Sequence, residues 1–123
     1  MAVAAHATLT DEQKEKVRKY GRECQKISHI SDETFDKLDK GESTEGEPHM
    51  REQGLCFFKK IGFLNDDLDI QFDDIKTKAE DLSHLTNPDE AIIKCKEHLK
   101  GTNKEDDAFE FFKCFRTETK FLE

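Results

Sequence analysis

The sequence lacks the features by which proteins enter membranes or bind nucleic acids. No apolar run approaches the roughly 18 residues that a membrane-spanning helix needs. The longest basic runs are pairs such as Lys59-Lys60, and the formal net charge is −8. Nucleic acids are bound through clustered lysine and arginine, and an anionic lipid surface repels an acidic protein. We therefore expect no nucleic-acid partner and no membrane insertion.

Catalytic motifs are missing as well. The six glycines form no loop of the kind that cradles phosphate, and no serine or cysteine stands in a nucleophile motif. Acidic residues number 28, so carboxylate pairs carry almost no information about acid–base chemistry. The sequence predicts neither an enzyme nor a cofactor.

What the chain does have is an even number of cysteines: Cys24, Cys56, Cys95 and Cys114. An even count in a short chain predicts two disulfides and an oxidising compartment. With 31, 38 and 18 residues between them, these cysteines lack the close pairs of structural zinc sites. Cys95 and His98 make one C-x2-H, which we interpret as an exposed histidine near a disulfide. We expect no metal.

A mature secreted protein is expected. The N-terminus lacks the basic segment and apolar run of a signal peptide, although Ala5-His6-Ala7 resembles a cleavage site. No Asn-x-Ser/Thr sequon occurs, so we expect no N-glycosylation. The length of 123 residues fits a single domain over 1–123, with 1–8 as a flexible lead.

The stretch 55–64 shows the pattern that runs through the chain. Leu55, Phe58 and Ile61 recur at helical spacing, and Gly62 is a stop signal for the helix. Cys56 stands within this helix, where it can tie the segment to another one. The other three cysteines also fall inside helical patterns, so the chain is predicted to be a bundle fastened helix to helix.

Caps and stops set the other boundaries. Thr10–Gln13 and Thr102–Glu105 are capping boxes, Ser31 and Asn87 are N-caps, and Pro48 suits a first helical position. The expected helices cover 11–28, 32–40, 48–61, 71–83 and 88–100, with a sixth starting after the second capping box. The residues expected on their inward faces include Val17, Tyr20, Cys24, Ile27, Phe35, Leu38, Phe72, Ile75, Ala79, Leu82, Ile92, Cys95, Leu99, Ala108, Phe111, Phe112, Cys114 and Phe115.

The predicted fold class is all-α, a compact bundle of about six short helices tied by two disulfides. The polar segment 41–48 is expected to be an exposed loop. The acidic stretch from Asn65 resembles the start of an EF-hand loop, but Ile70 and Lys76 occupy its sixth and twelfth positions in place of glycine and glutamate. We expect an acidic turn there.

The ten phenylalanines can be read in two ways. They are either ordinary core residues or the wall of an internal apolar cavity, the usual form of a small-molecule site. Helical periodicity identifies inward-facing rings but does not separate these readings.

The cysteine spacing resembles that of the insect pheromone- and general-odorant-binding proteins, specifically a four-cysteine, or minus-C, branch. The four cysteines match the first, third, fourth and sixth of the family's six-cysteine pattern. The missing second and fifth cysteines would fall at Glu52 and Glu105. The resemblance implies the pairs Cys24–Cys56 and Cys95–Cys114.

The resemblance also implies a function: a non-catalytic extracellular carrier of small hydrophobic odorants, pheromones or plant volatiles. A membrane receptor in trans is the macromolecular partner it suggests, and the chain is expected to be a monomer or a weak dimer in sensillar lymph or another secreted fluid. Helical phase and the resemblance together give these candidate ligand-binding residues: Val17, Tyr20, Phe35, Phe58, Ile61, Phe72, Ile75, Ala79, Ile92, Phe112, Phe115 and Phe121.

Alternatives to an odorant carrier stay open. The same fold can carry a hormone, nutrient or defensive compound, or the chain can be a protein-interaction module with a solid core and an exposed apolar patch. For a carrier, the Tyr20 hydroxyl is a candidate polar anchor, against the simpler reading of a surface hydroxyl. Related carriers change affinity with pH, for which His49, His84 and His98 are available.

Overall fold

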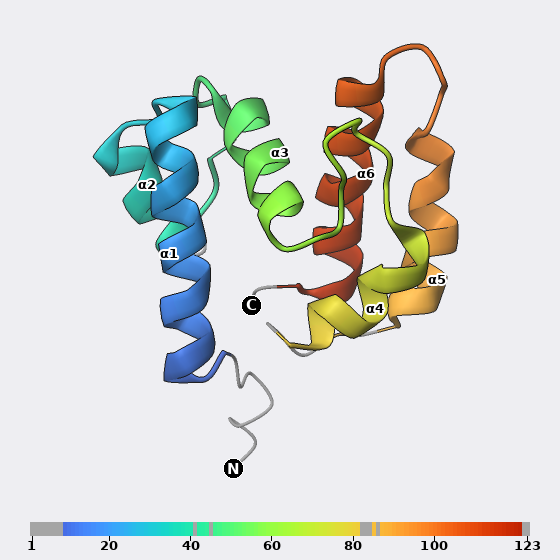
Figure 1. Cartoon of the computed structure of the whole chain (residues 1–123), viewed down its shortest axis with the longest axis horizontal. Helices are drawn as coiled ribbons and strands as arrows, with labels where there is room; N and C mark the ends of the chain where they lie inside the picture. The colour runs from blue at the N-terminus through green and yellow to red at the C-terminus, as the bar shows by residue number, and fades with distance from the viewer. Residues whose placement is uncertain (1–8, 41, 45, 82–84, 86, 122–123) are drawn as a thin grey trace.

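The computed structural model describes residues 9–40, 42–44, 46–81, 85 and 87–121, and these form an all-helical protein (Figure 1). The all-α prediction is confirmed. The elements are α1 (Asp11–Ser28), α2 (Asp32–Asp39), α3 (Met50–Lys60), α4 (Phe72–Glu80), α5 (Pro88–Cys95), the short 3-10 helix η2 (Lys96–His98) and α6 (Lys104–Thr119). None of these helices is long and apolar enough to span a bilayer.

Local signals explain where several helices begin and end. The Thr10 hydroxyl accepts a hydrogen bond from the backbone N–H of Gln13, and the Gln13 side-chain carbonyl accepts one from the backbone N–H of Thr10, so the first predicted capping box is confirmed. Ser31 likewise accepts from the N–H of Thr34 at the start of α2. Gly62 follows α3 with a φ of +84°, a left-handed conformation that favours glycine at a helix end.

Two predicted helix starts are wrong. Helix α3 begins at Met50 rather than Pro48, because His49 adopts a left-handed conformation (φ 66°) at the N-cap. The capping box at Thr102–Glu105 does not form. Instead, Asn103 accepts a hydrogen bond from the N–H of Asp106 at 3.0 Å and caps α6 one residue later. Both signals lie within two residues of the true start, where several cap residues compete.

The fourth and fifth helices are shorter than predicted. Helix α4 ends at Glu80 rather than near 83, and the inward position expected for Leu82 lies outside the described residues. The fifth α-helix ends at Cys95, continues as η2 and gives way to extended backbone at Leu99, before Lys100. Asn87 occupies the N-cap position and Pro88 the start of α5, as predicted, but Asn87 is left-handed (φ 49°) and its side chain makes no cap hydrogen bond.

The predicted acidic turn is confirmed between α3 and α4. The Asn65 side-chain carbonyl accepts the backbone N–H groups of Asp67 and Asp69, each at 2.9 Å. An isolated antiparallel bridge between Leu64 and Ile70 closes the turn.

The two disulfides tie the helices in pairs. Cys24–Cys56 joins α1 to α3 and Cys95–Cys114 joins α5 to α6, with Cα atoms 5.7 Å apart in each case. This is the pairing that the resemblance implied, and it is confirmed. Helices α1, α2 and α3 gather on one side of the molecule and α4, α5 and α6 on the other (Figure 1). Contacts between the two groups are therefore non-covalent.

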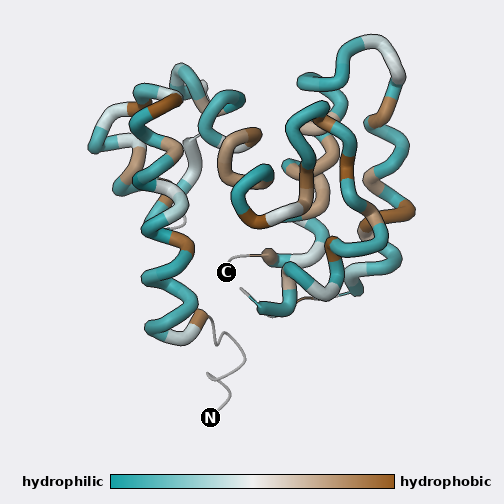
Figure 2. Tube along the Cα trace, viewed as in Figure 1, coloured by the Kyte–Doolittle hydropathy of each residue, from teal (hydrophilic) through white to brown (hydrophobic). Residues whose placement is uncertain are grey.

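Phenylalanine rings form a large part of the buried core. The fully buried large side chains include Phe63, Phe111, Phe112, Phe115 and Phe121, all at most 1% exposed. Their rings stack or meet edge to face, with neighbouring centroids 5.2–6.3 Å apart. Figure 2 shows how sparsely hydrophobic residues interrupt a mostly hydrophilic chain, so these few aromatics provide much of the core.

Ile27 does not face inward as predicted, since its side chain is 64% exposed. The buried stripe of α1 runs through Gly21, Cys24 and Ser28, and Ile27 lies beside it. The chain then reverses at His29, whose left-handed conformation (φ 65°) ends the helix, and Ile30 is the buried isoleucine of this corner, at 4% exposure.

Candidate functional site

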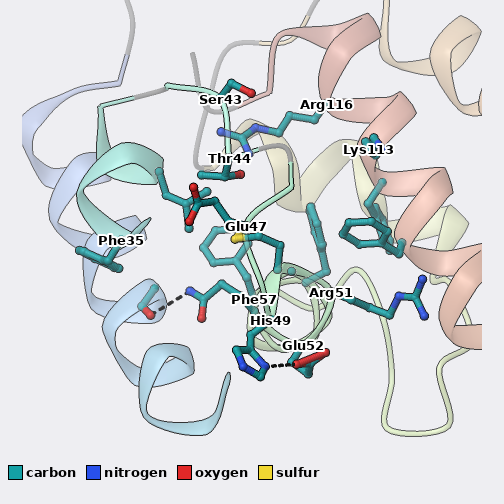
Figure 3. A pocket seen from close by; sticks show the side chains of 18 of the residues that line it. Phe35, Ser43, Thr44, Glu47, His49, Arg51, Glu52, Phe57, Lys113 and Arg116 are labelled. Carbon is teal, nitrogen blue, oxygen red and sulfur yellow. Dashed lines mark hydrogen bonds and ion pairs between the residues drawn. The ribbon is translucent and has the colours of Figure 1, made fainter. Parts of the chain in front are cut away.

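A pocket of about 710 Å³ lies between α1, α2, α3 and α6, beside the loop that joins α2 to α3 (Figure 3). Its volume falls in the range of about 300–1,000 Å³ that is typical of small-molecule sites. The lining residues are Val17, Arg18, Gly21, Phe35, Leu38, Asp39, Glu42, Ser43, Thr44, Gly46, Glu47, His49, Met50, Arg51, Glu52, Gln53, Gly54, Phe57, Phe58, Phe109, Phe112, Lys113, Arg116 and Thr117.

The inner wall of the pocket is aromatic. Phe58 of α3 and Phe112 of α6 stack with centroids 4.2 Å apart and planes inclined by 13°. Phe112 is 1% exposed and Phe58 is half-buried, and both also contact Phe63 of the core. The pair is therefore the boundary between the pocket and the filled interior. An apolar ligand on this wall would replace water against two rings, which is favourable.

Gly21 allows the opposite wall to close tightly. The Phe35 ring of α2 packs against α1 so closely that a Cβ on Gly21 would come within 2.9 Å of Phe35 Cε1. The Arg22 guanidinium lies over the same ring, 4.0 Å from its centroid. These contacts hold a 4%-exposed aromatic side chain at the edge of the pocket.

Gln53 is a buried polar residue in the pocket wall, at 3% exposure. Its side-chain carbonyl accepts a hydrogen bond from the Ser28 hydroxyl at 2.7 Å, and its amide donates to the Gly21 carbonyl at 3.1 Å. These bonds join α3 to α1 near the Cys24–Cys56 disulfide. Because the amide already has protein partners, we assign Gln53 to supporting the wall rather than to holding a ligand.

The segment predicted as an exposed loop contributes to the pocket. Thr44 and Glu47 are half-buried, and the Glu47 carboxylate accepts hydrogen bonds from the Thr34 hydroxyl at 2.9 Å and from Lys37 at 3.2 Å. The Thr34 bond and the neighbouring Lys37 charge hold the pKa of Glu47 below its usual range. The carboxylate therefore attaches the loop to α2.

Ion pairs surround the pocket. Arg18 donates two hydrogen bonds to Asp39, at 3.2 and 3.0 Å, and this partner raises the pKa of Arg18. Arg51 of α3 pairs with Asp106 of α6 at 2.7 Å, next to the positions where the family's second and fifth cysteines would fall. The latter pair joins two helices that have no disulfide between them.

One of the candidate histidines lies at the pocket. His49 lines the pocket and its ring nitrogen lies 3.0 Å from the Glu52 carboxylate. His98 belongs to η2 and is not among the lining residues, while His84 lies outside the described residues. Among the residues that the structure does describe, no three His, Cys, Asp or Glu side chains gather to hold a metal ion.

The structure brings four of the twelve candidate ligand-binding residues together at this pocket. They are Val17, Phe35, Phe58 and Phe112. The other eight pack in or against the core and do not line this pocket: Tyr20, Ile61, Phe72, Ile75, Ala79, Ile92, Phe115 and Phe121. Tyr20 meets Phe57 edge to face at 6.4 Å, so its ring is packed. A ligand-contact role for any of the twelve stays a prediction.

Four apolar residues that line the pocket were not among the candidate ligand-binding residues: Leu38, Met50, Phe57 and Phe109. Leu38 was expected to face inward, but the sequence does not show that α2 faces a pocket. Phe57 follows the cysteine of α3 and lies outside the Leu55–Phe58–Ile61 pattern that identified the inward face. Phe109 lies one turn from the buried Phe112 on α6, a spacing that could have signalled it.

Comparison with known proteins identifies the class. The model of the PBP/GOBP family matches residues 6–118. The chain is 34% identical over 116 residues to the B1 protein of Tenebrio molitor, covering 93% of this chain and 85% of that protein. It is 26% identical over 117 residues to general odorant-binding protein 56a of Drosophila melanogaster, covering 95% of this chain and 83% of that protein.

A solved structure agrees with these sequence matches. The fatty acid binding protein from the oral disk of the blowfly Phormia regina superposes with a TM-score of 0.67 at 33% identity, covering 92% of this chain and 96% of that one. The protein belongs to the PBP/GOBP family of odorant-binding proteins. Members of this family are binding proteins rather than enzymes, so the chain is a non-catalytic carrier of small apolar ligands.

Proposed function

We propose that this protein carries small hydrophobic volatile or semi-volatile molecules, and that it holds them in the pocket between α1, α2, α3 and α6. The aromatic wall of Phe58 and Phe112 is the observation that most supports this site. Secretion and membership of the four-cysteine branch are part of the proposal. They are supported by the two disulfides and by the absence of a cysteine at Glu52 and Glu105.

Affinity is expected to come mainly from burial of the ligand's apolar surface, at about 25 cal/mol per Å² removed from water. Such a term depends on size and shape, so selectivity should be broad and graded. Odorants, pheromones and plant volatiles fit this description. Longer apolar chains fit as well, and the name of the blowfly relative indicates that this family includes a fatty acid carrier.

Displacement of a fluorescent apolar probe tests the carrier function. The oxidised, delipidated protein would be titrated with the probe and then with volatiles and chain compounds of increasing size. We expect displacement at micromolar concentrations with a ranking by size. A protein that binds neither probe nor ligand after delipidation would instead be an interaction module with a solid core.

Two variants of α1 test the location of the site. Val17 lines the pocket, whereas Ile27 is 64% exposed on the same helix. Val17→Phe should fill part of the pocket and weaken binding of the larger ligands, while Ile27→Phe should leave binding unchanged. If both variants changed ligand affinity equally, or if Val17→Phe did not change it, the ligand would bind at another site.

pH-dependent release belongs to the proposal as well. Among the histidines in the described part of the chain, His49 lines the pocket, where it faces Glu52. Histidine changes charge between about pH 5 and pH 8. Equal ligand affinity at both ends of this range would refute the release mechanism.

A further inference from the structure

Phe109 lines the pocket where α6 faces α3. Its half-buried ring packs over Gly54, whose Cβ, if one were present, would meet Phe109 Cε1 at 3.6 Å. The Arg51 guanidinium lies 5.7 Å from the centroid of the ring and the Lys113 ammonium lies 5.8 Å from it. Among the described residues, no aromatic ring stacks on Phe109 or meets it edge to face. It therefore lacks the ring contacts that fix the other phenylalanines of α6.

Phe35 has a similar setting on another wall of the pocket, but it is held more tightly. A Cβ on Gly21 would stand 2.9 Å from the Phe35 ring, against 3.6 Å for Gly54 and Phe109. Phe35 is 4% exposed, and the guanidinium that covers its ring is 4.0 Å from the centroid rather than 5.7 Å. A side chain with fewer close neighbours moves more easily, so Phe109 is the more mobile of these two walls.

Arg51 is not placed to stabilise its own helix. It is the second residue of α3, where the helix dipole disfavours a positive charge. Its guanidinium instead pairs at 2.7 Å with Asp106, which lies in the first turn of α6, one turn before Phe109. In Figure 3 the Arg51 side chain extends from α3 toward α6, while the adjacent Glu52 faces His49. The ion pair thus fixes the guanidinium beside the Phe109 ring, between two helices that no disulfide joins.

We propose that Phe109 sets the upper size limit of the ligands, and that Arg51 is the positioning residue that holds its ring in the pocket wall. While Arg51 is paired with Asp106, the ring stays over Gly54 and bounds the pocket on the side of α3. A ligand that extends past this point must displace the ring and lose these contacts, so it binds less tightly. This inference rests on the proposed carrier function and names what determines selectivity in that same pocket.

A series of straight-chain alcohols measures this size limit. The alcohols are uncharged and differ only in chain length, and burial of each further CH2 should raise affinity about fourfold until the chain reaches Phe109. Beyond that length, affinity for the wild type should level off or fall. Competition against the fluorescent probe phenylnaphthylamine gives the chain length of highest affinity. A general loss of stability would lower all the affinities without changing that length.

Phe109→Ala should shift the highest affinity to longer chains, with a gain of about tenfold for the longest alcohols. Phe72→Ala is the matched control. Phe72 is a half-buried ring of α4 with the Lys96 ammonium 4.6 Å from its centroid, and it does not line the pocket. The control should keep the wild-type chain length of highest affinity. If circular dichroism shows that an alanine variant is unfolded, leucine at the same two positions gives the same comparison.

Arg51→Gln and Asp106→Asn test the positioning role. Each should raise affinity for the longest alcohols about two- to fivefold, because displacing the ring no longer breaks an ion pair. Both variants break the same pair, so the double variant should gain no more than either single one. Lys94→Gln/Glu118→Gln removes a 3.0 Å ion pair between α5 and α6 that does not line the pocket, and it should behave as wild type.

The outcomes distinguish this inference from the carrier function. An unchanged chain length of highest affinity in Phe109→Ala, or an equal shift in Phe72→Ala, would overturn the role of Phe109 and leave the carrier function intact. Wild-type affinity of Arg51→Gln for the longest alcohols would overturn the positioning role of Arg51. If neither the probe nor any alcohol binds the wild type, both proposals fail.

Discussion

Two glycines that line the pocket should respond in opposite ways to the same substitution. Gly21 lies within α1 and Gly54 within α3, and replacing an interior helical glycine by alanine stabilises a helix by about 0.5–1 kcal/mol. At Gly54 the new Cβ would meet the Phe109 ring at 3.6 Å, an ordinary contact. Gly54→Ala should therefore raise the free energy of unfolding by about 0.5–1 kcal/mol.

Gly21→Ala adds a steric cost to the same helical gain. Its Cβ would stand 2.9 Å from Cε1 of Phe35, and overpacking of this kind typically costs about 1–3 kcal/mol. Because the helical gain is common to both variants, the steric cost equals the difference between them. We expect Gly21→Ala to be about 1–3 kcal/mol less stable than Gly54→Ala.

Urea unfolding of the oxidised proteins, followed by circular dichroism, measures both variants. With a slope of about 2 kcal/mol per M, the two midpoints should differ by about 0.5–1.5 M. The displaced Phe35 ring should also reduce binding of the largest ligands in Gly21→Ala. Equal stabilisation of both variants would show that Phe35 does not pack against Gly21 and would refute the geometry of this wall.

Three further perturbations test the framework around the pocket. Ser28→Ala leaves the buried carbonyl of Gln53 without its donor and should cost about 1–3 kcal/mol in urea unfolding, whereas an unchanged midpoint would contradict the network. Replacing both Cys95 and Cys114 by serine should lower the free energy of unfolding by about 2–5 kcal/mol, and a loss below about 1 kcal/mol would show that α5 and α6 need no crosslink. The folded pKa of Glu47 is lowered, so its contribution to stability is present above the unfolded pKa and is lost as pH falls through the folded pKa. Glu47→Gln should therefore lose less stability than the wild type on acidification below about pH 4.5. If the stability of the variant and of the wild type fell in the same way with pH, the Glu47 carboxylate would not attach the loop to α2.

Much of the helical framework follows from local chemistry. The capping box at Thr10, the cap at Ser31 and the left-handed Gly62 act within a few residues, so the sequence contains all the information they need. The predicted starts of α3 and α6 differ from the observed ones by one or two residues. Helix α3 starts after the left-handed His49, and α6 is capped by Asn103 rather than by the neighbouring Thr102.

The site was harder to predict. Helical periodicity identifies residues that face inward, and it correctly placed Phe112 and Phe115 in the interior. Periodicity cannot distinguish inward residues that are enclosed in the core from inward residues that line a pocket. Phe115 is enclosed by other rings, while Phe112 has the Phe58 stack and the pocket beside it. That distinction depends on how the two disulfide-tied groups of helices meet.

The polar part of the pocket depends on tertiary structure even more strongly. Arg116 and Thr44 are separated by most of the chain, and nothing in their local sequence indicates that the loop between α2 and α3 passes close to α6. The polar composition of the segment 41–48 indicated only that this loop is exposed to solvent. Attachment of Glu47 to Thr34 and Lys37 brings this loop to the pocket.

A crystal structure with a long-chain fatty acid bound would test the location of the ligand site most directly. We predict electron density for the chain between Phe35, Phe58 and Phe112, the aromatic residues that line the pocket. Density on the other side of the aromatic wall, among Ile61, Ile75 and Ile92, would contradict the account. It would show that the ligand opens the packed core.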